Sequence, residues 1–125
     1  MNAMQQAQAG YGRAAHPIRT PRSAEYEAFA TVTSRMKSAS GGVPERFRDL
    51  AAAIHDNRRL WTILAADAAD QANMLPGDLR ARILYLAEFT RQHSGKVLRS
   101  GAAVQPLIEI NTAIMRGLRD RRQEA

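Results

Sequence analysis

The sequence predicts an all-α protein, a compact bundle of about four helices with a flexible N-terminal arm. Apolar residues recur three and four positions apart through most of the chain, which is the period of an amphipathic helix. Gly and Pro residues divide the chain into segments of helix length, and no segment shows the apolar–polar alternation of a half-buried strand. A chain of 125 residues can bury one core but not two. We therefore expect an arm at residues 1–20 and a single helical domain at residues 21–122.

The first expected helix begins at Pro21, because Thr20 is a good N-cap and Pro is favoured at the first helical position. Its apolar residues are Tyr26, Phe29, Val32 and Met36. Residues 40–43 include two glycines and end this helix. Residues 1–20 show no sustained periodicity and are therefore assigned to the arm.

Three more helices are expected after this break. The second begins at Pro44 and ends near Gln71, the third begins near Pro76 and ends at Gly101, and the fourth follows. One face of the second helix carries Phe47, Leu50, Ile54, Trp61 and Leu64, and the stripe of the fourth is Leu107, Ile110, Ile114 and Leu118. The third is apolar around much of its circumference, which is typical of a helix with neighbours on two sides.

Polar residues interrupt two of these apolar faces. Asn57 and Arg58 lie between Ile54 and Trp61, and Asn111 lies near the centre of the stripe on the fourth helix. A buried polar group is unfavourable unless it is hydrogen-bonded. Either these side chains bond within the bundle and fix its register, or they face a groove where a partner helix docks. Trp61 is expected to be buried.

Two apolar residues lie away from the main stripes of their helices, Ile63 on the second helix and Leu84 on the third. A single exposed apolar residue is ordinary and needs no explanation. Two of them on helices that pack together favour an interaction patch.

The residues that catalysis or metal binding requires do not form a recognisable pattern. The chain has no Cys, and its three His residues lie in the arm and on two different helices without metal-ligand spacing. His93 lies on the apolar face of the third helix and is predicted to pack or to cap rather than to bind a metal. No Gly-rich segment is placed to cradle a phosphate. We expect no enzymatic activity, no cofactor and no metal site.

The net charge of +6 suggests nucleic-acid binding until its distribution along the chain is considered. Residues 1–23 carry +3 and residues 116–125 carry +2, whereas residues 24–115 carry 11 basic and 10 acidic side chains. A basic groove on the folded body is therefore not predicted.

No apolar run approaches the ~20 residues that cross a membrane, and the N-terminus lacks the apolar core of a secretory signal. The expected compartment is the cytoplasm, with no membrane partner.

Four segments of the chain form a set that points to a known family. They are residues 9–12 (AGYG), residues 20–22 (TPR) followed by Glu25 and Glu27, residues 57–63 (NRRLWTI), and residues 107–111 (LIEIN) with Ile114, Gly117 and Leu118. Together they resemble the FlaF family of flagellar biosynthesis regulators, found in alphaproteobacteria. The resemblance extends from Tyr11 to Leu118, and its segment at residues 57–63 is quite specific. The chain departs from the family pattern at Thr112, where a basic residue is expected.

The resemblance implies a cytoplasmic helical protein that acts in flagellin production and export alongside FlbT, a post-transcriptional regulator of flagellin. By analogy, we expect a flagellin-binding chaperone or adaptor for the flagellar type III export route. The candidate protein-binding residues are then Asn57, Arg58, Trp61, Ile63 and Asn111.

Two alternatives belong to other functional classes. One is an RNA-binding regulator of flagellin expression that uses the basic arm and tail, and the other is a structural subunit of the flagellum. The nearly neutral body and the lack of an aromatic-rich stacking surface make nucleic acid the less expected partner.

Overall fold

The computed structural model describes residues 21–70 and 75–124, and it describes side chains for residues 24–70 and 75–117. This part of the chain contains four α-helices, one short 3-10 helix and no strand. The α-helices are α2 (Pro21–Ala39), α3 (Phe47–Ala69), α4 (Gly77–Ser100) and α5 (Gln105–Glu124), and the 3-10 helix η1 is Pro44–Arg46. The prediction of an all-α fold with four helices is confirmed. The expected arm and its boundary residue Thr20 lie outside the described residues.

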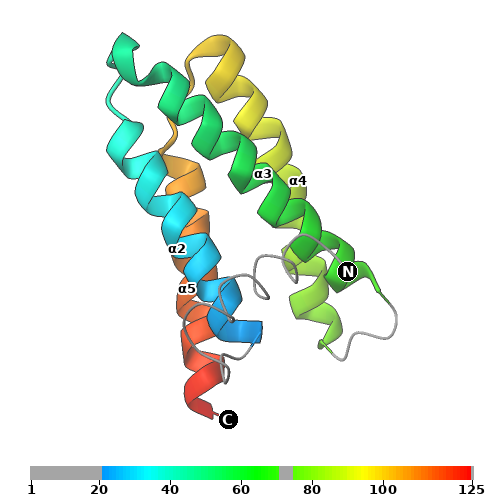
Figure 1. Cartoon of the computed structure of the whole chain (residues 1–125). Coiled ribbons are helices and arrows are strands. Elements are labelled where there is room, and N and C mark those ends of the chain that lie inside the picture. The colour runs from blue at the N-terminus through cyan, green and yellow to red at the C-terminus, as the bar shows by residue number, and fades with distance from the viewer. Residues whose placement is uncertain (1–20, 71–74, 125) are drawn as a thin grey trace.

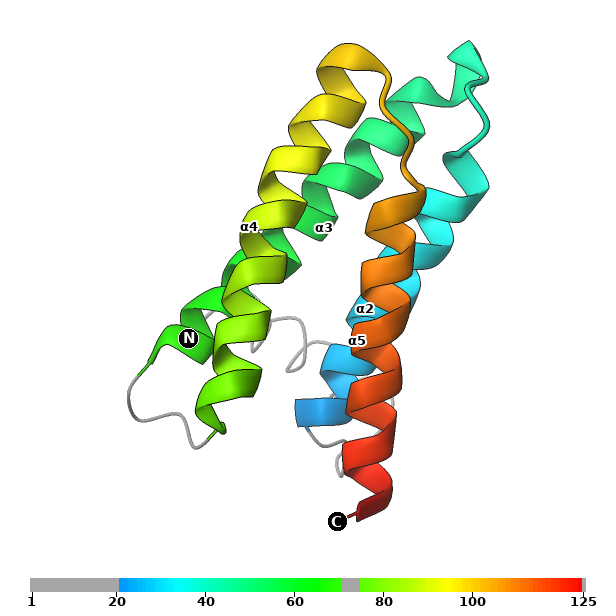
Figure 2. The ribbon, with the colours of Figure 1, turned by 180° about the vertical axis from the view of Figure 1, so that it is seen from behind.

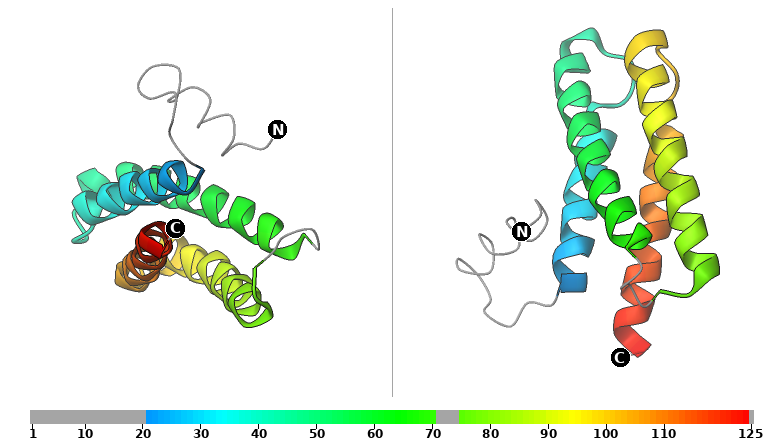
Figure 3. Two further views of the ribbon diagram at one scale, coloured as in Figure 1. Left: turned by 90° about the horizontal axis from the view of Figure 1, so that it is seen from below. Right: turned by 90° about the vertical axis from the view of Figure 1, so that its right-hand side faces the viewer.

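Successive helices run antiparallel to one another (Figure 1). α3 packs against both α2 and α4, α2 also packs against α5, and α4 meets α5 only sparsely. α4 and α5 lie close together near the segment that connects them and diverge toward their other ends (Figure 2). Seen from below, α3 and α4 extend away from the α2–α5 pair (Figure 3). The four helices therefore form a bundle that is closed at one end, where α4 and α5 meet, and in which these two helices diverge toward the other end.

The apolar core lies toward the closed end of the bundle, and every helix contributes to it. Its buried members are Val32, Met36, Ala53, Ile54, Val97, Val104 and Leu107. Phe29 of α2 and Trp61 of α3 extend the buried region, with their rings edge to face and their centroids 5.7 Å apart. Trp61 is 1% exposed, which confirms its predicted burial.

The helix boundaries follow the Gly and Pro signals, with one difference at the start of the second helix. Pro44–Arg46 forms a 3-10 turn, and the α-helix begins at Phe47. The apolar spacing places Phe47 on the core face, but Phe47 is 50% exposed. The reason is its place in the first turn of α3, beyond Leu50, which is the first α3 side chain packed against the core.

The apolar circumference of α4 predicts neighbours on two sides, whereas the structure gives it one full neighbour, α3. The α4 residues buried at this contact and around it are Ile83, Thr90, Ser94, Gly95 and Val97. Leu84 and Tyr85 remain 37% and 71% exposed. None of the helices in the described part of the chain has both the length and the apolar content that crossing a bilayer requires.

Gly101 ends α4 in the left-handed conformation, with φ at 70°, and its amide donates to the Lys96 carbonyl. Nothing lies within 4 Å of a Cβ added at Gly101, so a substitution there meets only backbone strain. We expect Gly101→Ala to lower the free energy of unfolding by about 1 kcal/mol, because residues with a Cβ are disfavoured in this conformation. Urea denaturation followed by circular dichroism measures the change.

Gly77→Ala is the matched control, because Gly77 also has open space around it but does not have a positive φ. Its free energy of unfolding should stay equal to that of the wild type or rise slightly. Equal stability of both variants would contradict the assignment of Gly101 as a strained cap.

Candidate functional site

Asn111 projects from α5 into the centre of the bundle and is completely buried. Its Oδ1 accepts a hydrogen bond from the Trp61 indole Nε1 at 2.9 Å. Its Nδ2 donates to the Asn57 Oδ1 at 2.7 Å and to the Thr33 Oγ1 at 3.0 Å. We refer to Thr33, Asn57, Trp61 and Asn111 as the Asn111 network. One amide group thus joins α2, α3 and α5.

The sequence spacing explains why these side chains converge. Asn57 and Trp61 are one turn apart on α3, so both reach the same amide on α5. Thr33 lies one turn from Phe29 on α2, and the Phe29 ring packs on Trp61. Sequence reasoning missed Thr33, although its spacing from Phe29 and Met36 places it on the apolar face of α2.

Three of the five predicted site residues therefore come together, and all three are at most 1% exposed. A direct contact between a partner and Asn57, Trp61 or Asn111 would require the bundle to open. The geometry supports the first of the two alternatives, in which the polar side chains bond within the bundle and fix its register.

Arg58, the fourth predicted residue, does not join the Asn111 network. It is half-buried, and its Nη2 donates to the backbone carbonyl of Arg91 on α4 at 3.2 Å. The Arg91 guanidinium itself binds the Glu88 carboxylate, with Nη2 and Oε1 2.6 Å apart. Hydrogen bonds from Arg91 and Gln92 lower the pKa of Glu88 to about 2. Arg58 thus ties α3 to α4.

Ile63, the fifth predicted residue, is half-buried on another side of α3. It lies seven residues after Asp56, whose carboxylate pairs with the Arg35 guanidinium of α2 at 2.7 Å. α3 thus faces α2 on the Asp56 side and α4 on the Arg58 side. Ile63 therefore lies on the α2 side of α3.

The contact between α3 and α4 contains polar atoms that have no hydrogen-bond partner. They are the Asn57 Nδ2, the Thr90 Oγ1 and the Ser94 Oγ, and all three are buried. The bond from Arg58 to the Arg91 carbonyl crosses the same contact, and Asn57 and Thr90 each lie one residue before its two partners. An unpaired buried polar group costs roughly 1–3 kcal/mol. The α3–α4 contact is therefore less favourable than its buried area alone would indicate.

His93 connects α4 to the segment that leads into α5. Its Nε2 lies 2.7 Å from the Ala103 carbonyl oxygen, to which it donates, and its ring stacks on Phe89 with centroids 5.4 Å apart. The prediction that His93 packs or caps is confirmed in its first form, since His93 packs on Phe89 and bonds outside α4 to the connecting segment.

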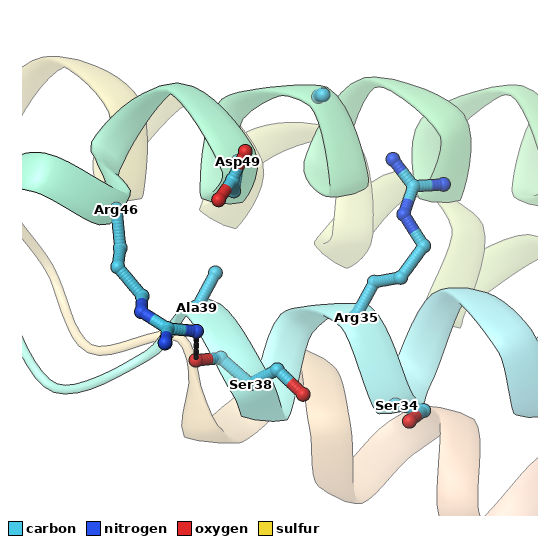
Figure 4. Close-up of a pocket in the computed structure, with 7 residues that line it drawn as sticks. Ser34, Arg35, Ser38, Ala39, Arg46 and Asp49 are labelled. Atoms are coloured by element: carbon cyan, nitrogen blue, oxygen red, sulfur yellow. Dashed lines mark hydrogen bonds between the residues drawn. The ribbon is translucent and has the colours of Figure 1, made fainter.

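A pocket of about 250 Å³ lies between the C-terminal half of α2 and the start of α3 (Figure 4). Its lining residues are Ser34, Arg35, Ser38, Ala39, Arg46, Asp49 and Ala52. Both arginines of the pocket are already bonded, Arg46 to the Ser38 carbonyl at 2.9 Å and Arg35 to Asp56. No residue of the Asn111 network lines this pocket.

The model of one protein family, described as flagellar protein FlaF, matches residues 7–118 of the chain. The match includes the Asn111 network and nearly all of the helical bundle. No curated protein and no solved structure matches the chain.

The Asn111 network generates a prediction about stability. Asn111→Ala removes one amide and leaves the Trp61 indole, the Asn57 carbonyl oxygen and the Thr33 hydroxyl without their bonds to it. We expect the free energy of unfolding to fall by about 3 kcal/mol, since several buried polar groups lose their partner together. Denaturation in guanidinium chloride monitored by Trp61 fluorescence measures this loss.

The neighbouring residue provides the control. The Thr112 hydroxyl bonds only to the Ile108 carbonyl of its own helix, so Thr112→Ala should cost less than about 1 kcal/mol. If Asn111→Ala lowers the free energy of unfolding by no more than Thr112→Ala does, the network does not hold the helices together.

Removing an unpaired hydroxyl should stabilise the α3–α4 contact. We expect Thr90→Val to raise the free energy of unfolding by about 1 kcal/mol, because Val has a similar shape and no polar group to bury. Thr62→Val is the comparison, since the Thr62 hydroxyl is exposed and bonded to the Arg58 carbonyl, and its stability should change little. A destabilised Thr90→Val variant, measured by urea denaturation, would show that this hydroxyl is paired in solution.

Proposed function

The chain belongs to the FlaF family of flagellar proteins, and from this we propose that it binds flagellin as a cytoplasmic chaperone or adaptor that couples flagellin synthesis to type III export. The observation that carries the proposal is the family match over residues 7–118, which covers most of the chain rather than a short motif. The match assigns the chain to flagellar biology, and the flagellin partner is our inference from the resemblance.

Two features of the bundle support a binding role. The Asn111 network holds α2, α3 and α5 in one register, which provides a rigid scaffold for a binding surface. α4 presents exposed apolar side chains, Leu84 and Tyr85, and among the described helices it has only one full neighbour. A rigid scaffold with accessible apolar groups lowers the entropic cost of capturing a partner segment.

The predicted site residues take an indirect part in this proposal. Asn57, Trp61 and Asn111 hold the bundle together, and Arg58 holds α4 on α3. Substitution of any of them should alter flagellin binding only as far as it alters the fold.

The test is binding of the purified chain to monomeric flagellin. Size-exclusion chromatography with light scattering detects the complex, and calorimetry measures its Kd. We expect a stable complex with a Kd of roughly 10 μM or tighter. Arg58→Ala should bind within about threefold of the wild type if it stays folded, because its bond goes to the Arg91 carbonyl and not to the partner. An unrelated exported protein serves as the negative control.

Absence of a complex with flagellin would contradict the proposal. A gel shift of flagellin message at physiological salt, with affinity that falls steeply as salt rises, would favour an RNA-binding regulator instead.

A further inference from the structure

Three aromatic side chains follow one line along α4, at positions i, i+4 and i+8. They are Tyr85, Phe89 and His93, which we call the aromatic ridge. Tyr85 is 71% exposed, and the other two are half-buried. The stack of Phe89 on His93 and the bond from His93 to the Ala103 carbonyl fix the C-terminal part of this ridge. Phe89 and His93 are therefore held in place before any partner arrives, and Tyr85 extends the ridge into solvent.

The ridge lies on the side of α4 that α5 leaves uncovered. His93 reaches the Ala103 carbonyl in the segment leading to α5, which orients its side of the helix toward α5. From that segment the two helices diverge, and their contacts are sparse (Figure 2). Apolar residues around much of α4 predict neighbouring helices on two of its sides. The side that carries the ridge has no neighbour among the described helices.

Three exposed charged side chains on this flank form no ion pair with a described side chain, namely Asp78 in the first turn of α4, Arg82 and Lys96, so the balance of charge is positive. Arg82 and Lys96 lie seven residues before and after Phe89, so all three share one line on the helix. The only Glu within the span of the ridge, Glu88, is already paired with Arg91.

We propose that the aromatic ridge is the docking surface for an amphipathic helix of a partner protein, whose apolar stripe is bordered by Asp or Glu side chains. The i, i+4 row of the ridge packs between the side chains of such a helix, and the partner's carboxylates lie against Arg82 and Lys96. Tyr85 is the main anchor, since large aromatic side chains dominate the energetics of interfaces. The inference rests on the proposed function, with a helical segment of flagellin as the partner.

Calorimetry with monomeric flagellin tests the surface with three variants. Tyr85→Glu should raise the Kd at least tenfold, because it places a carboxylate where an apolar and acidic partner docks. Arg82→Glu should raise the Kd about threefold or more at low salt, and this difference should shrink as salt rises. Phe47→Ala is the matched control, since Phe47 is a half-exposed aromatic residue at the start of α3, and its Kd should stay within twofold of the wild type.

Because Tyr85 and Arg82 are exposed, their variants should unfold at the same denaturant midpoint as the wild type. Wild-type binding together with undiminished binding by Tyr85→Glu would overturn the docking surface and leave the proposed function standing. Absence of binding by the wild type would overturn the proposed function, and with it the docking surface that rests on it. A wild-type dimer that Tyr85→Glu converts to a monomer in sedimentation would assign the ridge to a second copy of the chain and overturn the partner proposal.

Discussion

The side-chain amide of Asn111 is the interaction on which the bundle depends. It is completely buried, yet it accepts one hydrogen bond and donates two, so its full cost of desolvation is offset by partners on two other helices. Apolar packing alone tolerates small slips of one helix along another. A shift of α5 by one turn would leave the Trp61 indole and the Asn57 and Thr33 oxygens unpaired. The amide thereby selects one register for α2, α3 and α5.

α4 is held by different forces, and the proposed function depends on this difference. Its contact with α3 contains small polar side chains without hydrogen-bond partners, and a bond from Arg58 to the Arg91 carbonyl supplies a link. It meets α5 only sparsely, so one flank carries aromatic and basic side chains that no described helix covers. A three-helix unit in one register with a fourth helix exposed on one side suits the proposed capture of a helical segment, since the scaffold needs no rearrangement to present its surface.

The sequence predicted the helices better than their contacts. The three-four spacing of apolar residues and the Gly and Pro signals placed four helices correctly, because these are local properties of the chain.

The position of Asn57 and Asn111 within apolar stripes identified the unusual residues, but two interpretations stayed open, since helical periodicity does not say which helix faces which. Thr33 was missed for the same reason. Phe47 was placed in the core because periodicity does not indicate where the core ends along a helix. Arg58 and Ile63 share a helix with Asn57 and Trp61, but they lie on other sides of it and serve other contacts.

Hydrogen exchange of the Trp61 indole N–H, followed by NMR in the native state, tests the role of the Asn111 amide most directly. This proton is bonded inside the bundle, and α2, α3 and α5 enclose it. If the network holds the three helices in one register, the indole proton exchanges only through global unfolding, and its exchange free energy equals the free energy of unfolding from denaturation. Exchange with a free energy several kcal/mol below that value would show that the network opens locally and does not hold the bundle together.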